Sequence, residues 1–157
     1  MIKVNEKMPI GHLQQLVDGN LVTHNSAELF ANRKTVLFAV PGAFTPTCSA
    51  AHLPGYVVKA DELFGKGVDQ IVCLSVNDAF VMSAWGDAQN AENIMMLADG
   101  DGSYSQALGL AMETGEFGGL RSKRYAMIIE NNEVTSLFIE NPKEFEVSKA
   151  EVVLKDL

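Results

Sequence analysis

The sequence predicts an α/β protein in which helices flank a mixed central sheet. Residues 34–40 and 69–76 are apolar runs rich in β-branched side chains, which is typical of buried strands. A segment with helical character follows each run, and this alternation favours a layered α/β sandwich. Residues 124–130 and 133–140 flank an Asn-Asn turn pair, which predicts an antiparallel hairpin and therefore a mixed sheet.

The first two helices follow the buried strands along the chain. Residues 46–66 favour a helix, which Pro54 is expected to interrupt because proline lacks the backbone N–H that a helix interior needs. Residues 78–89 favour a second helix, and either Asn77 or Asp78 is suited to cap its N-terminus.

The remaining predicted elements are shorter. Residues 94–98 favour a short strand and residues 103–110 a short helix. Residues 148–157 favour a final helix with Ser148 as its cap. Clusters of Gly, Asp and Asn mark the expected loops, near residues 18–20, 99–103, 115–119 and 130–133.

The chain has the size and composition of a single domain spanning residues 1–157. Apolar residues make up 47% of it, which is enough for a full core. It contains no apolar run of about 18 residues, so no transmembrane helix is expected, and its formal charge of −8 argues against nucleic acid or an anionic membrane as partners. The charged N-terminal residues are unlike a signal peptide, so we expect a cytoplasmic or equally reducing location.

The two cysteines are too few for a disulfide scaffold, so their reactivity is the point of interest. Cys48 lies shortly after the first buried strand, beyond a Pro-Gly turn. Thr45 is suited to the N-cap and Pro46 to the first helical position, which places Cys48 third in the helix. Free N–H groups and the macrodipole there favour a nucleophilic thiolate. The alternative is an inert cysteine that packs as a small hydrophobe.

The segment PGAFTPTC resembles the peroxiredoxin signature P-x-x-x-T-x-x-C at Pro41, Thr45 and Cys48. Three further segments are similar to the type II, or peroxiredoxin-5-like, subfamily: HLPGY at 52–56, CLSVNDAFVMSAWG at 73–86 and RSKRYAMII at 121–129. The resemblance runs from about residue 3 to residue 141. It implies a thioredoxin-like fold, a homodimer built through loops near the active site, and a cofactor-free peroxidase that reduces hydrogen peroxide and alkyl hydroperoxides.

The resemblance also implies roles for individual residues. Cys48 matches the peroxidatic cysteine, whose thiolate attacks a peroxide and becomes a sulfenic acid. Thr45 matches the threonine whose hydroxyl bonds the thiolate and the peroxide, and Pro41 the proline that shields the pocket. Arg124 matches the arginine that stabilises the thiolate and polarises the O–O bond, with Arg121 as the competing choice. Without the family, these residues also fit a cap, a turn and a solvated strand entrance.

His52 and Cys73 each have two interpretations. His52 follows Cys48 by four residues, so on a continuous helix it shares a face with the sulfur, either as an assisting imidazolium or as a structural residue. The pair has no second set of ligands at metal spacing, so no metal is expected. Cys73 is expected to pack in the core of its strand, and it forms no C-x-x-C motif with Cys48.

The C-terminal segment lacks the resolving cysteine that some members of the subfamily carry. No intramolecular disulfide is therefore expected, and an external thiol must reduce the sulfenic acid. The resemblance favours glutathione with glutaredoxin as this reductant, with thioredoxin as an alternative. A redox sensor that reacts once without turnover is a further alternative.

Overall fold

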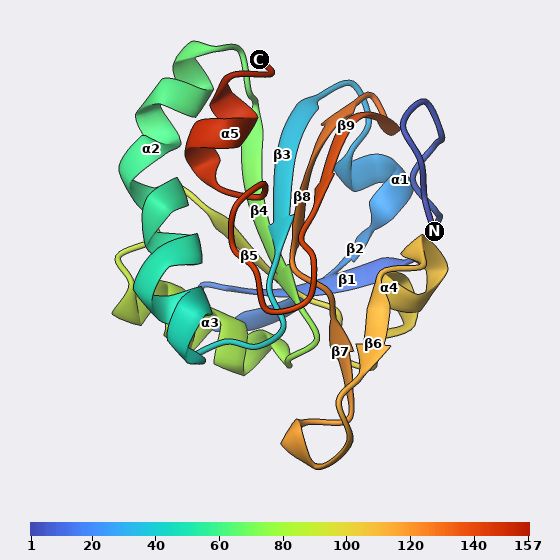
Figure 1. The fold of residues 1–157 in the computed structure, drawn as a ribbon, viewed down its shortest axis with the longest axis vertical. Coiled ribbons are helices and arrows are strands. Elements are labelled where there is room, and N and C mark those ends of the chain that lie inside the picture. The colour runs from blue at the N-terminus through green and yellow to red at the C-terminus, as the bar shows by residue number, and fades with distance from the viewer.

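The computed structural model describes all residues, 1–157, and Figure 1 shows a twisted central sheet with helices on both faces. The sheet has seven strands in the order β2-β1-β5-β4-β3-β8-β9. These strands are β1 (His12–Val17), β2 (Asn20–Asn25), β3 (Lys34–Ala39), β4 (Gln70–Ser75), β5 (Met95–Ala98), β8 (Tyr125–Glu130) and β9 (Glu133–Ile139). β3, β4 and β5 are parallel, whereas the other pairings are antiparallel, so the predicted mixed sheet is confirmed.

Five α-helices cover the sheet: α1 (Ser26–Leu29), α2 (Leu53–Gly65), α3 (Ala79–Ala88), α4 (Ser103–Leu108) and α5 (Ala150–Leu154). One core lies under α2, α3 and α5, and a second core lies under α1 and α4 (Figure 1). A separate two-stranded ribbon, β6 (Ala111–Glu113) with β7 (Leu120–Ser122), projects from the body of the protein (Figure 1). None of the helices has the length and apolar character needed to span a lipid bilayer.

The two central strands are apolar on both faces because each face supports one of the cores. On β3, Phe38 packs under α2 while its neighbour Leu37 packs toward the opposite helices. On β4, Cys73 packs in the core under α2 and Leu74 in the core on the opposite face. Successive side chains of a strand point to opposite faces, so a strand covered on both sides is a continuous apolar run. This confirms the prediction of two buried strands.

The predicted helix at 78–89 is confirmed, and its cap is Asp78. The Asp78 Oδ1 atom accepts a hydrogen bond from the Val81 N–H at 2.9 Å. The prediction of a helix over 46–66 is also correct, but the interruption precedes Pro54. A π-helical turn spans Cys48–His52, and Pro54 lies in the first turn of α2, where a missing N–H costs little.

The predicted end of the chain needs correction, and its beginning contains a hairpin that was not predicted. The final helix covers only Ala150–Leu154, and Ser148 is not its cap. Ser148 is buried, and its hydroxyl donates to Glu140 at 2.6 Å. The β1–β2 hairpin was not predicted, because Leu13 is the only fully buried side chain of its two strands and the apolar alternation is therefore weak.

Candidate active site

The loop after β3 delivers Cys48 to the start of the α2 helix. Pro46 and Thr47 are helical, and the Thr45 carbonyl accepts from the Ser49 N–H at 2.9 Å, so Thr45 occupies the N-cap position as predicted. The Thr45 hydroxyl donates to the Gly42 carbonyl at 2.6 Å and not to the Cys48 sulfur. Thr45 thus closes the turn that precedes the helix.

Cys48 opens a wide helical turn. The Leu53 N–H donates to the Cys48 carbonyl, five residues back, which defines the π-helical turn Cys48–His52. Both Cys48 and His52 have 0% exposure. π-turns are rare and often mark functional sites. Here the turn gathers a thiol and an imidazole at the same buried position.

Arg124 meets Cys48 although 76 residues separate them in sequence. Strand β8 pairs with β3 in antiparallel register, with Tyr125 opposite Ala39. Residue 124 therefore lies beside the C-terminal end of β3. The Arg124 Nη2 atom donates to the Cys48 Sγ at 3.1 Å. A guanidinium at this distance can donate a charge-assisted hydrogen bond to the sulfur.

Arg121, the competing arginine, lies outside this group. Its Nε donates to the Gly118 carbonyl and its Nη1 to the Val76 carbonyl, both at 3.0 Å. It therefore fastens the β6–β7 ribbon to the end of β4. Of the two candidates, the structure brings Arg124 to the sulfur.

His52 is neutral and accepts a hydrogen bond from Arg124. Burial, followed by the charge of Arg124, lowers the pKa of His52 to about 3. Its Nδ1 lies 2.9 Å from the Arg124 Nη1, which can only donate, so Nδ1 is the acceptor and the proton resides on Nε2. Nε2 then donates to the Ser148 carbonyl at 3.2 Å. The structure therefore does not support an assisting imidazolium.

Glu140 and Ser148 complete the surroundings of His52, and sequence reasoning assigned neither to the site. The Glu140 carboxylate accepts from the N–H groups of Glu146, Val147 and Ser148 and from the Ser148 hydroxyl. Burial alone raises the pKa of Glu140, but the hydrogen bonds from these three residues outweigh it, so the net pKa is lowered. A glutamate directly after an apolar strand is the one local signal, and it does not reveal these partners.

Cys73 lies in the middle of the sheet, on β4. It stands opposite Phe38 of β3 and Met96 of β5, and it has 0% exposure. Burial raises the pKa of the Cys73 thiol well above its usual range, and the Cys48 sulfur raises it further. Cys73 is therefore a neutral thiol in the core, as the sequence predicted.

A cavity of about 400 Å³ borders the reactive group. Pro41, Thr47 and Arg124 line it, and the shielding role that the resemblance implies for Pro41 stays a prediction. Lys123 and Lys143 line it as well, together with Glu140, Glu144 and several aromatic and aliphatic side chains.

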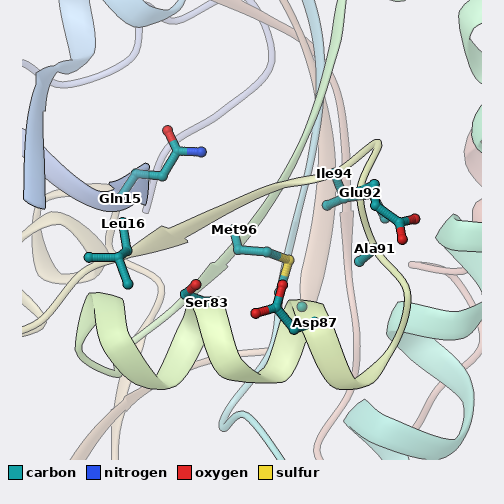
Figure 2. A pocket seen from close by; sticks show the side chains of 9 residues that line it. Gln15, Leu16, Ser83, Asp87, Ala91, Glu92, Ile94 and Met96 are labelled. Carbon is teal, nitrogen blue, oxygen red and sulfur yellow. The ribbon is translucent and has the colours of Figure 1, made fainter. Parts of the chain in front are cut away.

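A second cavity, of about 220 Å³, has a different lining. Figure 2 shows Ser83 and Asp87 of α3 facing Met96 of β5, with Gln15 and Leu16 of β1 alongside. It contains no cysteine, histidine or arginine. The first cavity is therefore the one lined by Arg124, the residue that donates to the Cys48 sulfur.

Comparison with known proteins places the chain in a family. The Redoxin family model matches residues 3–154. Peroxiredoxin-2D of Arabidopsis thaliana is 45% identical over 159 residues, which cover 99% of this chain and 98% of that protein.

Solved structures agree with this placement. Reduced Prx3 from Vibrio vulnificus in complex with hydrogen peroxide has a TM-score of 0.98 and 62% identity, covering 99% of both chains. Peroxiredoxin 5 from Alvinella pompejana has a TM-score of 0.86 and 34% identity, covering 99% of this chain and 97% of that one. Peroxiredoxins carry out their chemistry with a redox-active cysteine and an external reductant, without a prosthetic group. The chain belongs to the Redoxin family and is a type II peroxiredoxin with a thioredoxin-like fold, and hence a thiol peroxidase.

Proposed function

We propose that this peroxiredoxin reduces hydrogen peroxide and alkyl hydroperoxides at Cys48 and is recycled by glutathione with glutaredoxin. Peroxide reduction at Cys48 is supported by the 3.1 Å contact between the Arg124 Nη2 and the Cys48 Sγ at the start of a helix. A thiolate held in this way is a nucleophile. The similar Vibrio vulnificus Prx3 has been solved with hydrogen peroxide, which supports the choice of substrate.

The proposed reaction begins with attack of the Cys48 thiolate on one peroxide oxygen. An S–O bond forms as the O–O bond breaks, the sulfur loses two electrons, and the product is a sulfenic acid. The leaving oxygen takes a proton from solvent and departs as water or an alcohol. Arg124 is placed to stabilise the negative charge as it moves from sulfur to this oxygen.

The reductant is proposed from the state of the two cysteines. Resolving a sulfenic acid requires a thiolate, and the pKa of Cys73 is raised well above its usual range. Cys73 is also fixed between β3 and β5, and the chain has no third cysteine. An external thiol must therefore attack Cys48, release water and form a mixed disulfide. Glutaredoxin and a second glutathione then restore the Cys48 thiol, with oxidised glutathione as the product.

The cavity beside Arg124 supports a small anionic thiol as the reductant. Lys123 and Lys143 line it beside Arg124, whereas Glu140 and Glu144 line it too, so its side chains carry one net positive charge in a chain whose net charge is −8. Glutathione carries carboxylates that such lysines attract. A supply of reduced glutathione is characteristic of the cytosol, where we propose that the protein acts.

We also propose that two copies associate through the surface beside the active-site loop. Phe44 is 56% exposed and Phe80 is 60% exposed. The Ala43 N–H donates to the Asn77 Oδ1 at 3.0 Å, which holds this loop against the start of α3. Phe44 follows Ala43 in the loop, and Phe80 lies in the first turn of α3. Large exposed aromatic residues are typical of interfaces. Analytical sedimentation tests the proposal. The unmodified protein should sediment as a dimer, and Phe80→Glu should shift it toward the monomer.

The central experiment measures hydrogen peroxide consumption with glutathione and glutaredoxin, beside a parallel assay with thioredoxin and its reductase. We expect continuous turnover with the first system and none with Cys48→Ser. Turnover only in the thioredoxin assay would show that thioredoxin is the reductant, while the peroxidase reaction at Cys48 would stand. One equivalent of peroxide consumed per chain, with no further turnover in either system, would instead support a redox sensor.

A further inference from the structure

The Glu140 carboxylate organises a loop that reaches the catalytic arginine. Glu140 is 9% exposed, and it accepts from three consecutive N–H groups, those of residues 146–148, and from the Ser148 hydroxyl. Its own N–H donates to the Arg124 carbonyl at 3.1 Å. One residue thus fastens the backbone of Arg124 and closes residues 140–148 into a loop, which we call the 140–148 loop.

The 140–148 loop presents a single carbonyl to two buried donors. The Ser148 oxygen accepts from the His52 Nε2 at 3.2 Å and from the Tyr56 hydroxyl at 2.7 Å. Because Nε2 donates there, the lone pair of the His52 ring is on Nδ1 and faces Arg124. Phe38 and Phe145 pack against the ring, with centroids 5.0 and 4.9 Å away, and so restrict its rotation.

The guanidinium of Arg124 contacts both His52 and Cys48, so the position of the His52 ring affects the hydrogen bond to the sulfur. Nη1 is held by the His52 Nδ1 at 2.9 Å, and Nη2 donates to the Cys48 Sγ at 3.1 Å. The group is planar and its donors have a fixed fork geometry, so restraining one nitrogen restrains the other. Phe145 of the same loop also lies near the guanidinium, with its ring centroid 5.9 Å from the Arg124 Cζ.

We infer that Glu140, Ser148 and His52 are positioning residues that aim the Arg124 Nη2 at the Cys48 sulfur. The inference rests on the proposed peroxidase reaction at Cys48. His52 acts here as a neutral acceptor and transfers no proton to the peroxide. An imidazolium would lose the acceptor lone pair and place a second positive charge against Arg124.

The test replaces the carboxylate while keeping its shape. Glu140→Gln removes the negative charge that strengthens the four bonds to Oε2, and it puts a donor in place of Oε1, which accepts from the Glu146 N–H at 3.0 Å. We expect its second-order rate constant with hydrogen peroxide to fall roughly tenfold or more, since small misplacements of reacting groups are costly. Glu130→Gln is the matched control, because Glu130 is an exposed glutamate at the end of the neighbouring strand β8. Its rate should equal that of the unmodified protein.

A double-mutant cycle separates positioning from general structure. In an Arg124→Ala background, Glu140→Gln should cause no further loss of rate, because the residue it aims is absent. Equal losses with and without Arg124 would overturn the inference, as would an unchanged rate in Glu140→Gln alone. If the unmodified protein consumes no peroxide, the proposed function itself fails, which is a distinguishable outcome.

Variants of His52 keep the inference testable if Glu140→Gln does not fold. His52→Asn retains an oxygen near the position of Nδ1 that can accept from Arg124, whereas His52→Phe retains only a ring. We expect His52→Asn to recover part of the rate lost in His52→Phe. Equal rates in the two variants, both folded by circular dichroism, would contradict a role for the Nδ1 acceptor.

Discussion

The two cysteines occupy equally buried but chemically opposite regions of the molecule. Cys48 begins the wide turn before α2, and Cys73 lies in the middle of β4, both with 0% exposure. Cys48 receives a hydrogen bond from Arg124, whereas burial raises the pKa of Cys73 well above its usual range. Burial alone therefore does not distinguish the two sulfurs. The side chains that face them differ, because only Cys48 accepts a hydrogen bond from an arginine.

Removal of each sulfur should give the largest difference between the two regions. Cys48→Ser is expected to abolish peroxide turnover, because a serine hydroxyl does not ionise at neutral pH and is a poor nucleophile. Cys73→Ser should keep most of the activity, provided that the fold tolerates a hydroxyl in the core. Steady-state peroxide consumption measures both. A folded Cys73→Ser protein without activity would show that Cys73 takes part in turnover.

Alkylation compares the two sulfurs directly in the native protein. Under reducing conditions and at neutral pH, iodoacetamide should modify Cys48 at least about 100-fold faster than Cys73, since the thiolate is the reactive form. Peptide mass mapping over time gives both rates. In denaturant the difference should disappear, which serves as the control for intrinsic reactivity.

Loss of the guanidinium should make Cys48 behave more like Cys73. We expect Arg124→Ala to lower kcat/KM for hydrogen peroxide roughly 100-fold, within the range seen when a charge-stabilising donor is removed. Arg121→Ala is the comparison, because Arg121 bonds only to main-chain carbonyls away from the sulfur. A larger loss in Arg121→Ala than in Arg124→Ala would reverse the assignment of the two arginines.

The smallest expected effect concerns the pH dependence of stability near Cys48. Because the pKa of His52 is lowered to about 3, the unfolded chain binds a proton between about pH 6.5 and pH 3 that the folded chain does not. Stability is therefore lost as pH falls through this window. His52→Phe should remove about 1 kcal/mol of the loss between about pH 7 and pH 5.5. Urea unfolding at the two pH values measures it, and an unchanged slope would mean that His52 is protonated when folded.

The sequence predicted the central elements well because β3, β4 and α3 have strong local signals. Continuous apolar runs marked the two strands, and Asn77 and Asp78 marked the helix start, where the structure uses Asp78 as the cap. The β1–β2 hairpin and the β6–β7 ribbon were missed, because the first has few buried side chains and the second has strands of three residues. Short polar strands are defined by their partners in the fold and have little periodicity of their own.

The active site was predicted unevenly for a similar reason. Turn and cap residues placed Cys48 at a helix start but left an inert cysteine open, while its peroxidatic role and that of Arg124 came from the family resemblance. The neutral state of His52 and its bond to Ser148 depend on contacts between residues 96 positions apart, which no local pattern contains. Long-range hydrogen bonds and burial are properties of the folded chain, so they appear only in the structure.

The Ser148 carbonyl that receives both His52 and Tyr56 has one further consequence. It is a main-chain atom, so no single substitution can delete it, and only a change in the path of the chain can displace it. Insertions or deletions among the mostly exposed residues 141–147 would therefore change the rate of peroxide reduction while leaving every reactive side chain in place. Laboratory evolution of peroxide reactivity can thus proceed through the length of a surface segment, a variable that is independent of the catalytic signature.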